Sequence, residues 1–176
     1  MMRSVKTVVL AGAVLAASAV TASAQTIQAD ALKDWASMKD TMTKIAEAMP
    51  EAKFGFKATP AERSYAEQIL HIAQVNVGLM QSLGGKATAP MINMSATKKA
   101  DVIKAMNDSF DFGTAVIKEF NDQAMVAGAP NAPPFLGPST RARVVYGLIG
   151  HTWDIYGQMV VYLRLNGGVP PASQRP

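Results

Sequence analysis

The sequence predicts an all-α protein in which four long helices pack as one bundle, and three features of the chain support this prediction. Apolar residues recur at steps of three and four in four segments, which is the spacing of one face of an α-helix. Serine, threonine, glycine and proline stand at the ends of these segments, where helices start and stop. Segments that alternate polar and apolar residues, as half-buried strands do, are nearly absent. Helices with one apolar stripe each are most simply buried against one another in a four-helix bundle.

The first helix is expected over about residues 29–49, and the second is expected to end at about residue 83. A proline follows the first helix and a glycine pair follows the second, and both sequences end helices. Two capping boxes precede the second helix, Thr59–Glu62 and Ser64–Glu67, so either one can begin it. The inward residues expected in the two helices are Leu32, Trp35, Met38, Met42, Ile45, Met49, Ile69, Ile72, Leu79, Met80 and Leu83.

The third helix is expected over about residues 96–123, and the fourth begins near Ser139 or Thr140 and ends at Asn166. The connection AGAPNAPPFLGPS between them is longer than most loops of a bundle, and such loops often form the mouth of a pocket. The two tryptophans are interpreted as core anchors. The inward residues expected in these helices are Val102, Ile103, Met106, Phe110, Ile117, Phe120, Val144, Leu148, His151, Ile155, Met159 and Tyr162.

Residues 1–24 are predicted to be a signal peptide. Arg3 and Lys6 precede an apolar run, and Ala22-Ser23-Ala24 supplies the small residues that a signal peptidase reads. The run is shorter than the roughly 20 residues of a transmembrane helix, although an uncleaved anchor is the alternative. The mature chain, residues 25–176, is long enough for one core and one domain. We expect it to be periplasmic or secreted, without stable membrane insertion.

Charge and composition exclude several classes of function. The formal net charge is +4, and it falls to +2 when the two basic residues of the signal peptide are removed. Because no basic run remains, nucleic acid is not an expected partner. The chain has no cysteine, which excludes disulfides, cysteine nucleophiles and thiolate zinc sites. Neither a serine nucleophile elbow nor a phosphate loop is present.

Two histidines, His71 and His151, are the residues most suited to a functional site. Each stands in the middle of a predicted helix, on or beside its apolar face. Bundles form metal sites from inward side chains of facing helices, so a ligand role fits this placement. A buried histidine that only makes a hydrogen bond is the alternative. We expect both imidazoles to reach one cavity, and a separation above about 10 Å would exclude a shared site.

Three segments resemble the DinB-like family of four-helix metalloproteins, and the similarity covers essentially all of the mature chain. They are PAERSYAEQILHIAQVN (60–76), SFDFGTAVIKEF (109–120) and GPSTRARVVYGLIGHTWDIYGQMVVYLRLNGGVPPAS (137–173). The resemblance implies one divalent metal, commonly zinc or nickel, bound by a histidine of the second helix and a His-x-x-x-His pair of the fourth. It places the ligands at His71, at His151 and at position 155, where this chain has Ile155.

Isoleucine cannot bind a metal, so the sequence predicts a degenerate site. Asp154 is the alternative third ligand, and Gln68 is a weaker oxygen donor. The side chain of Asp154 is rotated by about 100° around the helix axis from that of Ile155, and this difference argues against Asp154 as the third ligand. Tyr156, Gln158, Tyr162 and Arg164 are further polar residues on the same helix.

Two hypotheses about function follow. In the first, which the sequence favours, the protein is a non-catalytic bundle that binds a small molecule or a partner protein, or forms a homodimer. In the second, which the resemblance implies, it is a metal-dependent thiol S-transferase or isomerase that uses His71, His151 and Asp154. The missing third histidine favours the first hypothesis, because loss of a ligand weakens a metal site strongly.

Overall fold

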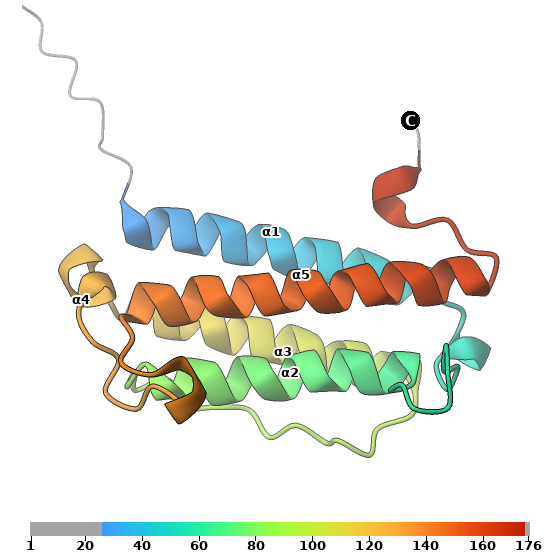
Figure 1. Ribbon diagram of the computed structural model, residues 1–176, viewed down its shortest axis with the longest axis horizontal. Helices are drawn as coiled ribbons and strands as arrows, with labels where there is room; N and C mark the ends of the chain where they lie inside the picture. Colours follow the sequence, from blue (N-terminus) through green and yellow to red (C-terminus); the bar gives the residue numbers. More distant parts are fainter. Residues whose placement is uncertain (1–25, 175–176) are drawn as a thin grey trace, which may run out of the picture.

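A computed structural model describes residues 26–174, and this part of the chain is all-helical, as predicted. The long helices form a bundle, and a short fifth helix lies at one end of it (Figure 1). None of the described helices is long and apolar enough to cross a membrane. The predicted signal peptide lies outside the described residues. The helices are α1 (Ile27–Ala48), α2 (Tyr65–Ser82), α3 (Lys99–Lys118), α4 (Asp122–Val126) and α5 (Arg141–Leu165), with 3-10 turns η1 (Glu51–Lys53), η2 (Pro134–Leu136) and η3 (Pro171–Ser173).

Contacts between helix ends establish the direction of each helix. Tyr65, at the start of α2, donates from Oη to the carbonyl of Ile45 near the end of α1 (2.5 Å). Lys99, the first residue of α3, donates from Nζ to a carbonyl of the last turn of α1 (2.6 Å). Tyr162, near the end of α5, donates to the carbonyl of Arg63 just before α2 (2.7 Å). Helices α1 and α5 therefore run one way and α2 and α3 the other, so residues 83–98 lead back along the bundle (Figure 1).

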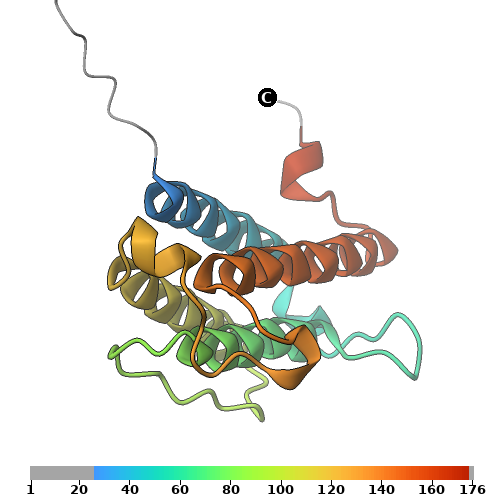
Figure 2. The same cartoon turned by 60° about the vertical axis from the view of Figure 1, so that its left-hand side comes forward.

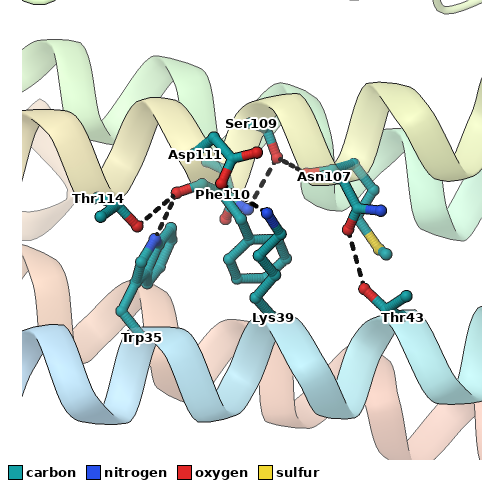
Figure 3. Close-up of polar contacts among 10 residues, drawn as sticks. Trp35, Lys39, Thr43, Asn107, Ser109, Phe110, Asp111 and Thr114 are labelled. Atoms are coloured by element: carbon teal, nitrogen blue, oxygen red, sulfur yellow. Dashed lines mark hydrogen bonds and ion pairs between the residues drawn. The ribbon is translucent and has the colours of Figure 1, made fainter.

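The α1–α3 interface depends on a close approach at one glycine. Trp35 is fully buried, and its Nε1 donates to the carbonyl of Phe110 (2.8 Å), whose ring lies 4.7 Å from the indole between centroids (Figure 3). Gly113 lies against the same indole, and a Cβ atom there would be 2.5 Å from Cζ2 of Trp35. Since that distance is far inside van der Waals contact, only glycine fits at this position.

Helix α2 begins at the second of the two predicted capping boxes. Ser64 and Glu67 bind each other's backbone N–H groups, with a Ser64 N to Glu67 Oε2 distance of 2.6 Å. The alternative start at Thr59–Glu62 is wrong, because residues 59–62 form a turn. The backbone N–H groups of the first two residues of α2 donate to the carbonyls of Phe56 and Phe54, which prevents the helix from extending further back.

The third predicted helix, residues 96–123, is shorter than expected and is followed by a separate short helix. Helix α3 ends at Lys118, and Asn121 begins α4 by accepting a hydrogen bond from the backbone of Ala124 (2.9 Å). Gln28 of α1 donates from Nε2 to three carbonyls at the end of α3, the closest being that of Phe120 (2.6 Å). A side chain distant in sequence thus satisfies the carbonyls that a longer helix would have used.

Most residues of the predicted apolar stripes lie in the core, and of the two tryptophans only Trp35, which belongs to a stripe, is buried with them. Trp35 is buried as expected, whereas Trp153 is 49% exposed and packs its ring against Tyr156 on the solvent side of α5. The prediction of Trp153 as a core anchor is wrong because α5 directs Thr152 and Ile155, the neighbouring helical positions, inward instead. Leu79 is only half-buried, and it lines a cavity rather than the packed core.

Candidate functional site

The structure brings the two histidines together. His71 projects from the middle of α2 and His151 from the middle of α5, and these neighbouring helices run in opposite directions. The centroids of the two imidazole rings are 5.2 Å apart, and the ring planes are nearly perpendicular at 84°. Both side chains are half-buried and both line one cavity, which confirms the prediction of a common cavity.

This histidine cavity has a volume of about 310 Å³ and walls that are mostly apolar. One wall comes from α2, one from α5, and the third from the η2 turn in the long connection before α5. The two imidazoles are its only polar side chains. Its lining residues are His71, Val75, Leu79, Phe135, Leu136, Val144, Gly147 and His151.

The connection that contributes Phe135 and Leu136 is held in place by hydrogen bonds. Arg143 of α5 donates from Nη1 to the carbonyl of Leu136 (2.6 Å), and the backbone of Asn131 donates to the carbonyl of Ser82 (3.2 Å). Residues 127–140 therefore cross from α4 to α5 over the end of α2 (Figure 2). This result confirms that the long connection forms part of a pocket mouth, with Phe135 78% exposed at its rim.

The position implied for a third metal ligand holds a core residue. Ile155 is 2% exposed and lies on the inward face of α5 with Leu148 and Met159, which are fully buried. Asp154 is exposed, and its Oδ2 accepts a hydrogen bond from Nε2 of Gln158 (3.1 Å). Within residues 26–174, no three His, Cys, Asp or Glu side chains lie close enough together to hold a metal ion.

A pair of glutamines joins the two helices next to the histidines. Nε2 of Gln68, which is fully buried, donates to Oε1 of Gln158 (2.8 Å). Oε1 of Gln68 and Nε2 of His151 are buried, and neither has a hydrogen-bond partner among the described residues. Since buried polar atoms are nearly always paired, with protein, water or ligand, each of these two atoms is expected to have a polar partner of its own.

Burial, and to a smaller extent the charge of Arg63, lower the pKa of both imidazoles and so favour their neutral forms. Desolvation is the largest cause that lowers the pKa of His71, and the charge of Arg63 and the neighbouring His151 lower it further. Desolvation also lowers the pKa of His151, where Asp154 acts in the opposite direction and Arg63 adds to the decrease. Each neutral imidazole offers one hydrogen-bond donor and one acceptor.

His71 also lines a second hollow, of about 420 Å³, that is bordered by charged residues. Lys57 is within ion-pair distance of Glu67, at 3.6 Å from Nζ to Oε2. Arg63, in contrast, makes no ion pair with any residue of the described range. The hollow is lined by Lys57, Ala61, Glu62, Arg63, Glu67, His71, Gln74 and Met94.

Sequence reasoning missed several residues of the site. Arg63 and Gly147 were not predicted as site residues. Neither belongs to a motif, and their places in the linings depend on the packing of α5 against α2. For Phe135 and Leu136, the length of the connection was the only signal. Tyr162 has a structural role through its bond to the backbone before α2, and Arg164 is an exposed residue in the last turn of α5.

Comparison with known families agrees with this architecture. A sequence model of the DinB superfamily matches residues 35–159 of the chain. The chain belongs to the DinB superfamily. The crystal structure of a DinB-like protein from Bacillus cereus ATCC 10987 is similar to this DinB chain, with a TM-score of 0.72 and 19% sequence identity. The match covers 84% of this chain and 97% of the other, and at this identity it supports a common fold. None of the curated proteins matches the chain.

The residues of this DinB site fit the implied metal only in part. Zn–N bonds of about 2.1 Å place the centroids of two imidazoles on one ion about 5 Å apart, so the observed 5.2 Å is compatible with a shared ion. Nε2 of His151 has no hydrogen-bond partner among the described residues, so it is also suited to bind a metal ion. The third donor is missing, because Ile155 is apolar and Asp154 is exposed and bonded to Gln158. The described residues therefore do not form the three-ligand centre.

Proposed function

We propose that this DinB protein is exported and binds a small, largely apolar molecule in the histidine cavity, without a tightly bound metal. The observation that carries this proposal is the buried Ile155 at the position of a metal ligand, next to two imidazoles that open into an apolar cavity. A metal centre with two donors from the protein binds its ion weakly. An apolar cavity of this size, in contrast, favours a ligand that removes apolar surface from water.

The cavity volume limits the size of the ligand. At the roughly 30 Å³ that a water molecule occupies in the liquid, 310 Å³ holds about ten non-hydrogen atoms. Ligands of this size reach a Kd of about 1–100 µM when they fill a preformed cavity. The two imidazoles then orient the ligand, because each offers a donor and an acceptor at one end of an otherwise apolar space.

Gly147→Leu tests this function directly. Gly147 lines the cavity, and a Cβ atom there would meet nothing within 4 Å, so a leucine side chain should occupy the ligand's space. We expect calorimetric titration with 1-octanol to show binding by the wild-type protein and at least a tenfold loss in the variant. Replacing a helical glycine should also raise the free energy of unfolding by about 0.5–1 kcal/mol.

Gly157→Leu is the matched control. Gly157 is also an exposed glycine of α5 with nothing within 4 Å of its Cβ position, but it does not line the cavity. This variant should gain similar stability and bind 1-octanol like the wild type. Equal binding by all three proteins, or no binding by any of them, would contradict the proposed function.

Export is proposed from the sequence of residues 1–24. The basic start, the apolar run and Ala22-Ser23-Ala24 favour cleavage after Ala24. Intact-mass measurement of protein from the extracytoplasmic fraction should therefore give a chain that begins at Gln25. An uncleaved chain in the cytosol would contradict this prediction.

The alternative function is a metal-dependent thiol S-transferase or isomerase that uses His71, His151 and Asp154. The spacing of the imidazoles and the unpaired Nε2 of His151 favour it. For this function, Asp154 has to exchange its bond with Gln158 for a bond to the metal. Asp154→Asn would then abolish zinc binding, whereas the proposed function predicts no tight binding in either protein.

A further inference from the structure

The outer face of α5 carries apolar side chains that no other part of the described chain covers. Four large ones are 40–60% exposed, namely Tyr146, Trp153, Val161 and Leu165. Since each residue turns the helix by about 100°, six positions lie within about 40° of one outward direction, opposite to the buried Ile155. These six positions, the outer stripe, are Tyr146, Gly150, Trp153, Gly157, Val160 and Arg164. The core of one bundle does not require this second apolar face of α5.

The spacing of the outer stripe suits a second helix. Its residues follow one another in steps of four and three, which is the spacing of the seam between two packed helices. Trp153 stands between Gly150 and Gly157, and a Cβ atom at either glycine would meet nothing within 4 Å. Glycines at these places allow another backbone or a large ring to approach closely. Because the order of the steps is the same from either end, two antiparallel copies of the stripe can match each other.

Opposite charges lie at the two ends of the outer stripe. Burial raises the pKa of Tyr146, and the charges of Asp34 and Asp30 of α1 raise it further, so both carboxylates lie near its hydroxyl. Arg143, also at this end, is bonded to the connection before α5. At the other end Arg164 is exposed. Neither Arg164 nor the two aspartates form an ion pair within residues 26–174. About 27 Å of helix separates Tyr146 from Arg164, so these opposite charges cannot pair within one chain.

We propose that a second copy of this chain docks on the outer stripe, with the two α5 helices antiparallel about a two-fold axis. In this arrangement, Trp153 of each copy packs over Gly157 of the other. Arg164 of each copy meets Asp30 and Asp34 of the other, beside Tyr146. A parallel pair would instead place Arg164 against Arg164 and the aspartates against each other. Charge and spacing therefore both favour the antiparallel dimer.

The mature wild-type protein tests the proposal without any substitution. Sedimentation equilibrium should give twice the mass of the mature chain at micromolar concentrations, and dissociation on dilution. Tryptophan emission should shift to the red over the same range of dilution, because Trp153 becomes exposed to water. The chain has two tryptophans, and Trp35 is fully buried within each copy, so the shift reports Trp153.

Trp153→Gln should raise the dissociation constant of the dimer at least about a hundredfold, because each dimer loses two central aromatic side chains. Trp153 lies outside the core, so circular dichroism should show an unchanged fold. Met91→Gln is the matched control. Met91 is a fully exposed large apolar residue in the connection between α2 and α3, and this variant should dimerise like the wild type.

Charge reversal tests the antiparallel arrangement. At low salt, Arg164→Glu and Asp34→Lys should each weaken the dimer about tenfold, since each places like charges opposite one another. The double variant Asp34→Lys, Arg164→Glu exchanges the two charges across the interface. Its dissociation constant should return to within about threefold of the wild-type value.

Each alternative outcome overturns a defined part of the proposal. A wild-type protein that stays monomeric at high concentration, with emission that does not change on dilution, would refute the dimer. Equal dimerisation by Trp153→Gln, or loss of the dimer in Met91→Gln, would place the interface elsewhere. Single reversals that weaken the dimer without recovery in the double variant would exclude the antiparallel arrangement. None of the outer-stripe residues lines the histidine cavity, so binding of 1-octanol and dimerisation can fail independently.

Discussion

Ile155→His should raise the affinity for zinc by about 10²–10³-fold. Apparent zinc-binding free energies of about 10–16 kcal/mol for four-ligand sites correspond to about 2.5–4 kcal/mol for each ligand. Position 155 is one helical turn beyond His151 and is buried, so we expect a histidine there to project toward the two existing imidazoles. Calorimetric zinc titration of variant and wild type measures the gain.

Two controls identify the source of the gain. His71→Ala in the Ile155→His background should abolish it, because the new site then loses a donor from α2. Without zinc, Ile155→His should lower the free energy of unfolding by about 1–3 kcal/mol, since it replaces a buried isoleucine with a polar ring, and zinc should restore it. No gain in zinc affinity would mean that position 155 does not face His71.

Gly113→Ala should destabilise the bundle by about 2–3 kcal/mol, despite the higher helix propensity of alanine. The added Cβ atom would lie 2.5–2.8 Å from three atoms of the Trp35 indole. The indole cannot move aside easily, because it is fully buried and its Nε1 is bonded to the carbonyl of Phe110 (Figure 3). Chemical denaturation followed by circular dichroism measures the loss.

Gly78→Ala is the matched control for this prediction. Gly78 is an exposed glycine within α2, and a Cβ atom there would meet nothing within 4 Å. This variant should gain up to about 1 kcal/mol from helix propensity alone. If Gly113→Ala were as stable as Gly78→Ala, the close approach of α1 and α3 at Trp35 would be incorrect.

The helices and the histidine pair were predictable because they depend on local patterns. The stripes in steps of three and four located the four long helices, and Ser64–Glu67 and Thr140 marked the starts of α2 and α5 correctly. A histidine near the middle of each of two adjacent helices is enough to predict a common cavity, since the helices of a bundle bring their inward faces together.

The remaining features depend on contacts between residues that are distant in sequence. The end of α3 is fixed by Gln28, which lies about 90 residues earlier, so no local pattern indicates it. The charge of Arg63 acts on His151 only because α5 returns beside the start of α2. Trp153 was predicted to be a core anchor from the size of its side chain alone. It stands outside the apolar stripe of α5, and its 49% exposure agrees with the periodicity and not with the residue type.

The proposal that the protein holds no tightly bound metal is tested most directly by its metal content. The wild-type protein is purified from its native compartment without chelators, analysed for metal and then titrated with zinc. Because the buried Ile155 stands where a third ligand would be, we expect clearly less than one equivalent of metal on isolation and only weak binding in the titration. One tightly bound equivalent of zinc or nickel would contradict the claim, and would make Asp154 the leading third ligand of a functional metal centre.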